Sequence, residues 1–262
     1  MLRPRIIPCL LIKNGGLVKT TRFADPKYVG DPINAVRIFN EKEVDELTVL
    51  DIDATSCRRE PNYTMISDLA AECRMPLCYG GGVNTLEHVE KIISLGVEKV
   101  AISAAAIRSP ELITKAAARV GSQSLVIVID VKPSGLLGRY EVFTHNGKNN
   151  TGVDPIDFAR QVEDLGAGEV VVNAIHCDGE MKGYDIELIS QIRNAISLPL
   201  TALGGAGSLA DISGIIQRFG IIGAAAGSLF VFKGKYRAVL INYPRQNEKD
   251  AIIFNTTQQR LG

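Results

Sequence analysis

The chain has 262 residues, 46% of them hydrophobic, and its 29 lysines and arginines balance its 29 aspartates and glutamates. This length allows one α/β barrel or two small domains with a large core. The zero formal net charge argues against nucleic acid or an anionic membrane as the main partner, because both favour a basic surface. No stretch approaches the roughly 18 consecutive apolar residues of a transmembrane helix.

Short apolar runs rich in β-branched residues recur along the chain. They predict strands at 5–12, 46–52, 76–79, 99–103, 124–131, 169–175, 198–203 and 221–226. Helical patterns lie between them at 61–73, 85–95, 110–120, 154–165, 184–196 and 209–219. Apolar strands that alternate with amphipathic helices indicate a parallel sheet covered by helices. Eight such strands favour an α/β fold of the (β/α)8 TIM barrel type over an open doubly wound sheet.

An internal repeat supports the barrel. Gly80-Gly-Gly82 is followed by Asn84 with Glu87 three positions on, and Gly204-Gly-Ala-Gly207 is followed by Ser208 with Asp211. Both read as a glycine turn and a capping-box helix start, 124 residues apart. We expect a single domain over residues 1–262, built from half-barrels at about 1–120 and 121–240. A small hairpin at 136–147 and a polar C-terminal extension from about residue 244 complete the expected organisation.

The N-terminal apolar stretch is interrupted by Pro8 and lacks a small-residue cleavage site, so we interpret it as a first strand rather than a signal peptide. The five cysteines are odd in number and form no CxxC pair, which indicates thiols of a cytoplasmic protein. His145 and His176 lack metal-ligand spacing with other candidates. We therefore expect a cytoplasmic protein without a metal or a cofactor.

The C-terminal ends of the strands should carry the site, since barrel active sites lie there. Asp51 and Asp130 each end an apolar strand, and Asp178 follows another, either as a functional residue or as a turn residue before glycine. The repeat places Leu11 opposite Asp130, where an aspartate would supply the second carboxylate of an acid–base pair. Lys19 either closes over an anionic ligand or is a solvated surface lysine.

The two glycine turns lie at symmetric positions of the repeat. Backbone N–H groups at such turns, with the dipole of the next helix, favour a phosphate. Each turn is paired with a strand end of small residues, at Ser103-Ala104 and at Ala226-Gly227-Ser228. Tight turn geometry is the alternative explanation for one turn alone, but the symmetric pair predicts a phosphorylated small molecule with two phosphates across the mouth.

At the opposite end of the barrel, charged residues precede four of the apolar strands. They are Arg5, Glu46, Lys99 and Glu169. They are either solvated strand ends or a ring of ion pairs that plugs the bottom of the barrel. Two cations and two anions neutralise one another, which is how charges are tolerated in a confined interior.

Several ordered motifs carry a family resemblance: Arg5-Ile-Ile-Pro-Cys9, Leu50-Asp51-Ile52, Gly80-Gly-Gly82, Gly183-Tyr-Asp185 and Gly204-Gly-Ala-Gly-Ser208. In these the chain resembles, from end to end, the cyclase subunit of imidazole glycerol phosphate synthase. The resemblance implies a barrel that docks a glutaminase subunit at its N-terminal face and conducts ammonia to a bisphosphate substrate at the mouth. It places the ammonia gate on the four charged strand starts and one catalytic aspartate on Asp130.

The departures from the family also lie at the mouth. The second catalytic aspartate of the family falls on Leu11. Together with the glycine turns, the resemblance assigns phosphate or substrate binding to Lys19, Asp51, Gly81, Gly82, Ser103, Ala104, Asn173, Asp178, Gly204, Gly205, Gly227 and Ser228. Ser103, Asn173, His176 and Leu203 replace residues usual in the family. The resemblance thus implies a preserved ammonia path and an altered cyclisation site.

Two hypotheses follow. In the first, the chain resembles barrel subunits of surface-polysaccharide synthesis, which serve a glutaminase and a sugar amidotransferase that forms an acetamidino group. In the second, it is a working cyclase–lyase of histidine biosynthesis that uses Asp130 as its main acid–base residue. A ketose-forming isomerase on a related scaffold is a third option, and Leu11 counts against it because that chemistry also needs two opposed carboxylates.

Overall fold

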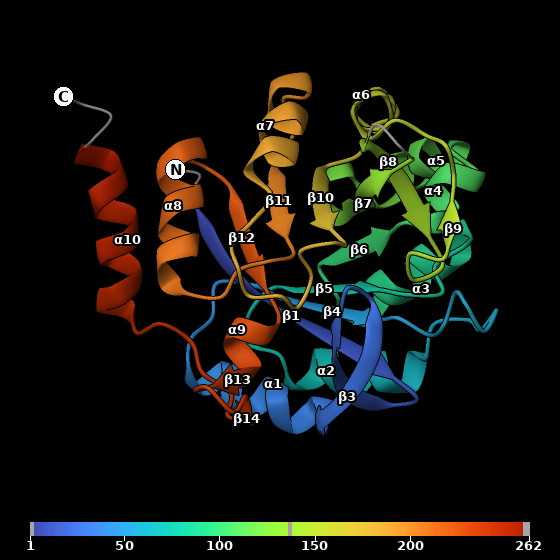
Figure 1. Ribbon diagram of the computed structural model, residues 1–262. Helices are drawn as coiled ribbons and strands as arrows, with labels where there is room; N and C mark the ends of the chain where they lie inside the picture. The colour runs from blue at the N-terminus through green and yellow to red at the C-terminus, as the bar shows by residue number, and fades with distance from the viewer. Residues whose placement is uncertain (1–2, 136–137, 259–262) are drawn as a thin grey trace.

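The computed structural model describes residues 3–135 and 138–258 (Figure 1). Within these residues, eight parallel strands close a barrel. They are β1 (Arg5–Lys13), β4 (Leu47–Asp51), β5 (Leu77–Gly80), β6 (Lys99–Ile102), β7 (Leu125–Ser134), β10 (Glu169–Ala174), β11 (Leu200–Leu203) and β12 (Gly223–Ala226). β1 pairs with both β4 and β12, and β10 pairs with both β7 and β11. The predicted (β/α)8 TIM barrel is confirmed.

Helices cover the outside of this barrel (Figure 1). They are α1 (Pro32–Glu41), α2 (Tyr63–Glu72), α3 (Leu86–Ser94), α4 (Ala104–Arg108), α5 (Glu111–Val120), α6 (Pro155–Asp164), α7 (Ile186–Ala195), α8 (Leu209–Phe219), α9 (Ser228–Val231) and α10 (Gln246–Gln258), with a 3-10 turn at Ser122–Ser124. No helix within the described ranges is long and apolar enough to cross a membrane.

The alternation of side chains along β1 shows how the barrel uses its two faces. Ile6, Leu10 and Ile12 pack outward in the main core between strands and helices. Ile7 and Cys9 point inward, where they pack with Ala225 of the neighbouring strand β12 and with Leu203 of β11, the next strand along. Successive side chains of a strand face opposite sides, so the odd positions of β1 line the interior from Arg5 at the bottom to Leu11 at the mouth.

Two hairpins extend the barrel at its mouth. β2 (Gly16–Thr21) and β3 (Ala24–Gly30) form an antiparallel pair after β1 that the sequence patterns do not predict. The second hairpin is the predicted one: β8 (Arg139–Thr144) pairs antiparallel with the last five residues of β7, and the short β9 (Asn149–Asn150) pairs with β8. Residues 136–137 of the expected hairpin lie outside the described residues.

The helix starts confirm one predicted cap and correct the other. Ser208 caps α8, and with Asp211 it forms the expected reciprocal capping box. The N-cap of α3 is Thr85, not Asn84, because α3 begins one residue later than the pattern indicated. The side chain of Asn84 instead donates a hydrogen bond to the carbonyl oxygen of Gly82, 2.9 Å away.

A clamp from the C-terminal extension holds the bottom of the barrel. The Tyr243 hydroxyl donates to the carbonyl of Ile6 at 2.8 Å and accepts from the backbone N–H of Asp45. Lys249, on α10, is only 4% exposed and donates to the Asp45 carboxylate at 3.1 Å and to the Glu43 carbonyl at 3.0 Å. Asp45 also accepts from the N–H of Ile6. We call Tyr243, Lys249 and Asp45 the C-terminal clamp.

We expect Lys249→Met to lower the free energy of unfolding by about 3 kcal/mol, because the buried carboxylate of Asp45 then loses the ammonium group that pairs with it. Arg3 is too exposed and too distant, at 3.8 Å, to replace the lost ammonium. Urea denaturation measures the change. The matched control, Lys115→Met on the exposed face of α5, should shift stability by less than about 0.5 kcal/mol. Equal stability of the two variants would contradict the clamp.

Candidate functional site

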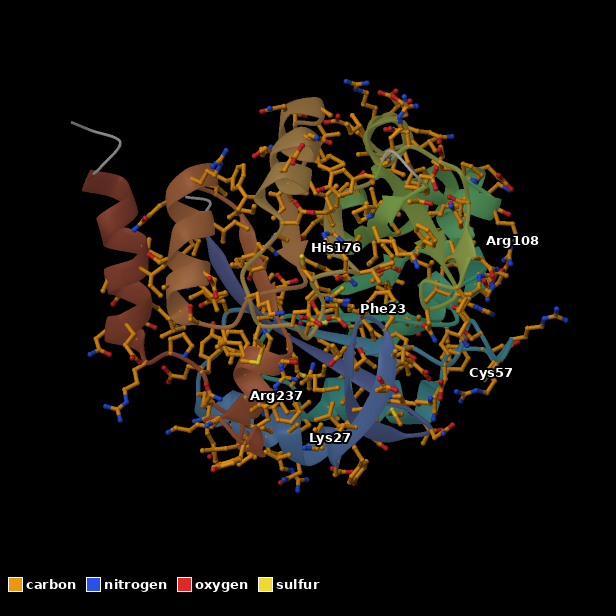
Figure 2. All side chains as sticks on the ribbon, viewed as in Figure 1. Phe23, Lys27, Cys57, Arg108, His176 and Arg237 are labelled. Atoms are coloured by element: carbon orange, nitrogen blue, oxygen red, sulfur yellow. The ribbon has the colours of Figure 1, made fainter. Side chains whose placement is uncertain are left out.

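A cavity of about 130 Å³ lies at the C-terminal ends of the barrel strands. The structure brings most of the predicted binding residues together there: Lys19, Asp51, Gly81, Gly82, Ser103, Ala104, Asp130, Asn173, Asp178, Gly227 and Ser228 line it. Gly204 and Gly205 do not, since their turn packs against Ala174 and Gly183 behind Leu203. Among the residues not foreseen are Phe23, His145 and Asn146, from loops around the mouth. Figure 2 shows Phe23 at the open end of the barrel.

Asp130 is the acid–base candidate of this mouth. Its Oδ1 accepts a hydrogen bond from Asn173 Nδ2 at 3.0 Å, and its Oδ2 faces the Ser103 hydroxyl at 3.5 Å. Desolvation raises its pKa to about 7, and the hydrogen bonds from Asn173 and Ser103 offset only part of that rise. A carboxyl group that titrates near neutral pH can both donate and accept a proton, as general acid–base chemistry requires.

Opposite Asp130 the wall is apolar. Leu11, half-buried on β1, packs with Cys9 and Leu203 and lines the mouth. No carboxylate stands at this position to complete a pair. Ser103 and Asn173, which also depart from the family pattern, are the two residues that contact the Asp130 carboxylate. Two of the sequence departures therefore lie directly at the Asp130 carboxylate.

The other carboxylates at the mouth are already engaged. Asp51 Oδ1 accepts from the backbone N–H groups of Asp53 and Ala54, at 3.0 and 3.1 Å, and so holds the turn after β4. Desolvation raises the pKa of Asp51, while those hydrogen bonds and Arg59 oppose the rise. Asp178 accepts from the Thr20 hydroxyl at 3.1 Å. Both residues shape the mouth through their turns and strands.

Lys19 reaches into the cavity from β2. Its ammonium group donates to the carbonyl oxygen of Cys9 and lies against Gly227, where a Cβ atom would collide with it. The side chain is buried, so the alternative of a solvated surface lysine is wrong. Desolvation lowers the pKa of Lys19, and the nearby Cys9 and Asp178 oppose that change. A cation beside the Gly227–Ser228 turn favours an anionic ligand group there.

His176 lies outside the cavity lining, in a cluster of its own. Its Nε2 lies 3.0 Å from Asp185, which also accepts from the Tyr140 hydroxyl at 2.7 Å and caps α7 through the N–H of Leu188. The aspartate expected here by resemblance is thus replaced by a residue tied to the start of α7. No group of three or more histidine, cysteine, aspartate or glutamate side chains in the described part of the chain is placed to hold a metal ion.

At the bottom of the barrel the four charged strand starts form a closed ring. Arg5 pairs with Glu46 and, at 2.7 Å, with Glu169. Lys99 Nζ lies 2.9 Å from Glu46 and 2.8 Å from Glu169. Each cation therefore meets both anions. The alternative of separate solvated strand ends is wrong, since Glu46 and Glu169 are 4% and 6% exposed.

The ring is electrostatically self-consistent. Burial alone would favour neutral side chains, but the attraction between ring members outweighs it. The pKa of Arg5 is raised by Glu169 and Glu46 despite desolvation, and the pKa of Lys99 is raised in the same way. The pKa of Glu169 is lowered by Arg5 and Lys99. These directions keep Arg5, Lys99 and Glu169 charged at neutral pH.

A narrow chamber lies between the ring and the mouth. Its volume is about 10 Å³, the size of one water-sized molecule. Cys9, Leu50, Ala101, Val128 and Leu203 line both this chamber and the mouth cavity. The interior between the charged ring and the mouth is therefore mainly apolar.

The comparisons with known proteins match this architecture. The profile of the histidine biosynthesis protein family matches residues 5–237. The chain belongs to this family. Three relatives carry provisional assignments as imidazole glycerol phosphate synthase subunit HisF: proteins of Leptospira borgpetersenii (56% identical), Vibrio vulnificus (hisF3, 55%) and Pseudomonas aeruginosa (hisF2, 53%). The alignments cover 95–97% of this chain and 96–100% of the relatives. The chain is therefore a barrel subunit of the cyclase type.

We expect Asp130→Asn to stabilise this cyclase-type barrel at pH 8 by about 2 kcal/mol and to leave it nearly unchanged at pH 4. The folded pKa is raised to about 7, so the folded state binds more protons than the unfolded state between pH 4 and 7 and loses stability as pH rises through this window. Urea unfolding at the two pH values measures the difference. Asp68→Asn, at an exposed position of α2, is the control. A pH-independent effect of Asp130→Asn would refute the raised pKa.

Proposed function

We propose that this chain is the ammonia-conducting barrel subunit of a glutamine-dependent amidotransferase that serves acetamidino-sugar formation in surface-polysaccharide synthesis. The observation that carries the proposal is the contrast between the two ends of the barrel. The ring of Arg5, Glu46, Lys99 and Glu169 is complete, while the mouth holds Leu11 opposite Asp130. A positioned acid–base group typically contributes about 10²–10⁴-fold to a rate, so its replacement by leucine removes cyclisation more than conduction.

In this proposal a glutaminase subunit docks at the N-terminal face of the barrel, where the ring lies. Ammonia released there passes the ring and the chamber, and leaves at the mouth toward a sugar amidotransferase. A phosphorylated small molecule bound by Lys19 and the Gly81–Gly82 and Gly227–Ser228 turns acts as effector or occupies a reduced site. The names hisF2 and hisF3 of two relatives support a paralogue, because they number these genes among several in one genome. The complex is cytoplasmic, and neither nucleic acid nor membrane is a partner.

A second function is favoured by Asp130 itself. A working cyclase–lyase of histidine biosynthesis would need a remaining carboxylate that titrates near neutral pH, as Asp130 does with its pKa of about 7, beside anion-binding groups such as Lys19 and the Gly81–Gly82 and Gly227–Ser228 turns. In that case Leu11 is tolerated, and the substrate is phosphoribulosyl aminoimidazole carboxamide ribotide with ammonia.

Turnover of that ribotide with excess ammonium at alkaline pH separates the two functions, since free ammonia removes the need for a glutaminase. We expect a rate about 10²–10⁴-fold below that of a family member with both aspartates. Leu11→Asp should raise the rate at least about tenfold, because it restores the missing proton-transfer group. Leu11→Asn should not raise the rate, because asparagine has nearly the shape of aspartate but lacks its carboxylate. A wild-type rate within about tenfold of an ordinary family member would reject conduction as the sole function.

A reconstituted system tests the leading function directly. With a glutaminase subunit and a sugar amidotransferase present, we expect amination of an acetamido sugar from glutamine only when the barrel is added. With ammonium in place of glutamine, the barrel should be dispensable, because the acceptor enzyme then takes ammonia from solution. Amination from glutamine at the same rate without the barrel would exclude the conduit.

A further inference from the structure

Thr201 is an uncharged residue that joins the ring of Arg5, Glu46, Lys99 and Glu169 as a fifth member. It lies on β11, next to Glu169 on β10, and is 2% exposed. Its hydroxyl donates to Glu169 Oε1 at 2.6 Å and lies 3.4 Å from Arg5 Nη2, which itself bonds the same carboxylate oxygen at 2.7 Å. The hydroxyl thus uses its donor on the anion and offers its lone pairs to the cation.

The neighbouring strand leaves room for this hydroxyl. Thr201 pairs with Gly223 of β12, and a Cβ atom on Gly223 would overlap Thr201 Oγ1. Gly223 does not have the left-handed backbone conformation that requires glycine. The space taken by the threonine side chain is therefore the reason that a glycine is needed at this position of a buried strand.

The two carboxylates of the ring differ because of Thr201. Glu46 is held by Arg5 and Lys99, whereas Glu169 is held by Arg5, Lys99 and the threonine hydroxyl. A hydrogen bond to a charged group in a buried network is stronger than one between neutral groups. Arg5 and Glu169 are therefore held in place by more hydrogen bonds than Glu46 and Lys99.

We propose that Thr201 is a positioning residue of the ammonia gate, which anchors Glu169 and Arg5 while ammonia passes. This inference rests on the proposed conduit function. Thr201 also lines the chamber directly above the ring, so the same side chain holds the gate and forms the wall that ammonia meets next. With its one donor on Glu169 and one lone pair facing Arg5, the hydroxyl keeps a second lone pair that can accept a hydrogen bond from a small polar molecule.

Isotope competition tests the role of Thr201 in the reconstituted system. Glutamine labelled with ¹⁵N in its amide is supplied together with excess unlabelled ammonium, and the label in the product measures how much nitrogen travels inside the barrel. We expect Thr201→Val to lower the retained label about threefold or more, because valine fills the space without a hydrogen bond. Thr201→Ser should restore it. Thr48→Val, on the opposite wall of the chamber, is the control for lost polarity alone.

Gly223→Ala gives an independent test, since its new methyl group displaces the hydroxyl of an unchanged Thr201. It should lower label retention as Thr201→Val does. Retention equal to wild type in both variants, or no rescue by serine, would overturn the proposal.

A second readout needs only the barrel. Exchange of the Arg5 guanidinium protons with water, followed by NMR, should be faster in Thr201→Val than in wild type, and unchanged exchange would also overturn the anchoring role. Complete loss of label already in the wild-type system would instead reject the conduit itself. The guanidinium measurement distinguishes these two failures.

Discussion

Two cations and two anions are confined within the lower end of a closed barrel, and their mutual neutralisation is the condition on which that end of the structure depends. Removing water from isolated charges is costly, and removing any one ring member would leave its partners uncompensated. Because the four residues come from β1, β6 and β10 and from the residue that precedes β4, the ring also ties together strands that are distant in sequence. Above this charged ring the interior is mainly apolar.

The mouth of the barrel differs from the charged ring because its charges do not neutralise one another in a closed set. Here the carboxylate of Asp130 is desolvated by its surroundings and lies opposite an apolar wall. The backbone turns and Lys19 can still attract an anionic group, since these features do not depend on the residue at position 11. In the proposed conduit, a small neutral molecule needs no charge partner inside the barrel. Under that proposal, conduction and proton transfer are separable properties of one barrel.

The sequence predicted the barrel because repeated apolar runs mark its strands. For the four charged strand starts the pattern left solvated ends and a ring of ion pairs open, and only the family resemblance favoured the ring. The β2–β3 hairpin escaped prediction because the segment from Ala24 to Gly30 is polar and largely exposed, without alternation. α1 was missed although Asp31 and Pro32 form a helix-start signal. The burial of Lys19 and the contact between Thr201 and Glu169 depend on cross-strand neighbours, which no local pattern records.

The C-terminal clamp determines how late in synthesis the barrel can finish folding. It joins Ile6 and Asp45, near the beginning of the chain, to Tyr243 and Lys249, near its end. β1 must likewise wait for β12 as its second neighbour. During synthesis the early strands therefore emerge with one edge unpaired, and contacts of such large sequence separation form slowly. The barrel can close completely only after α10 has been synthesised. β1 is made first and therefore stays exposed longest.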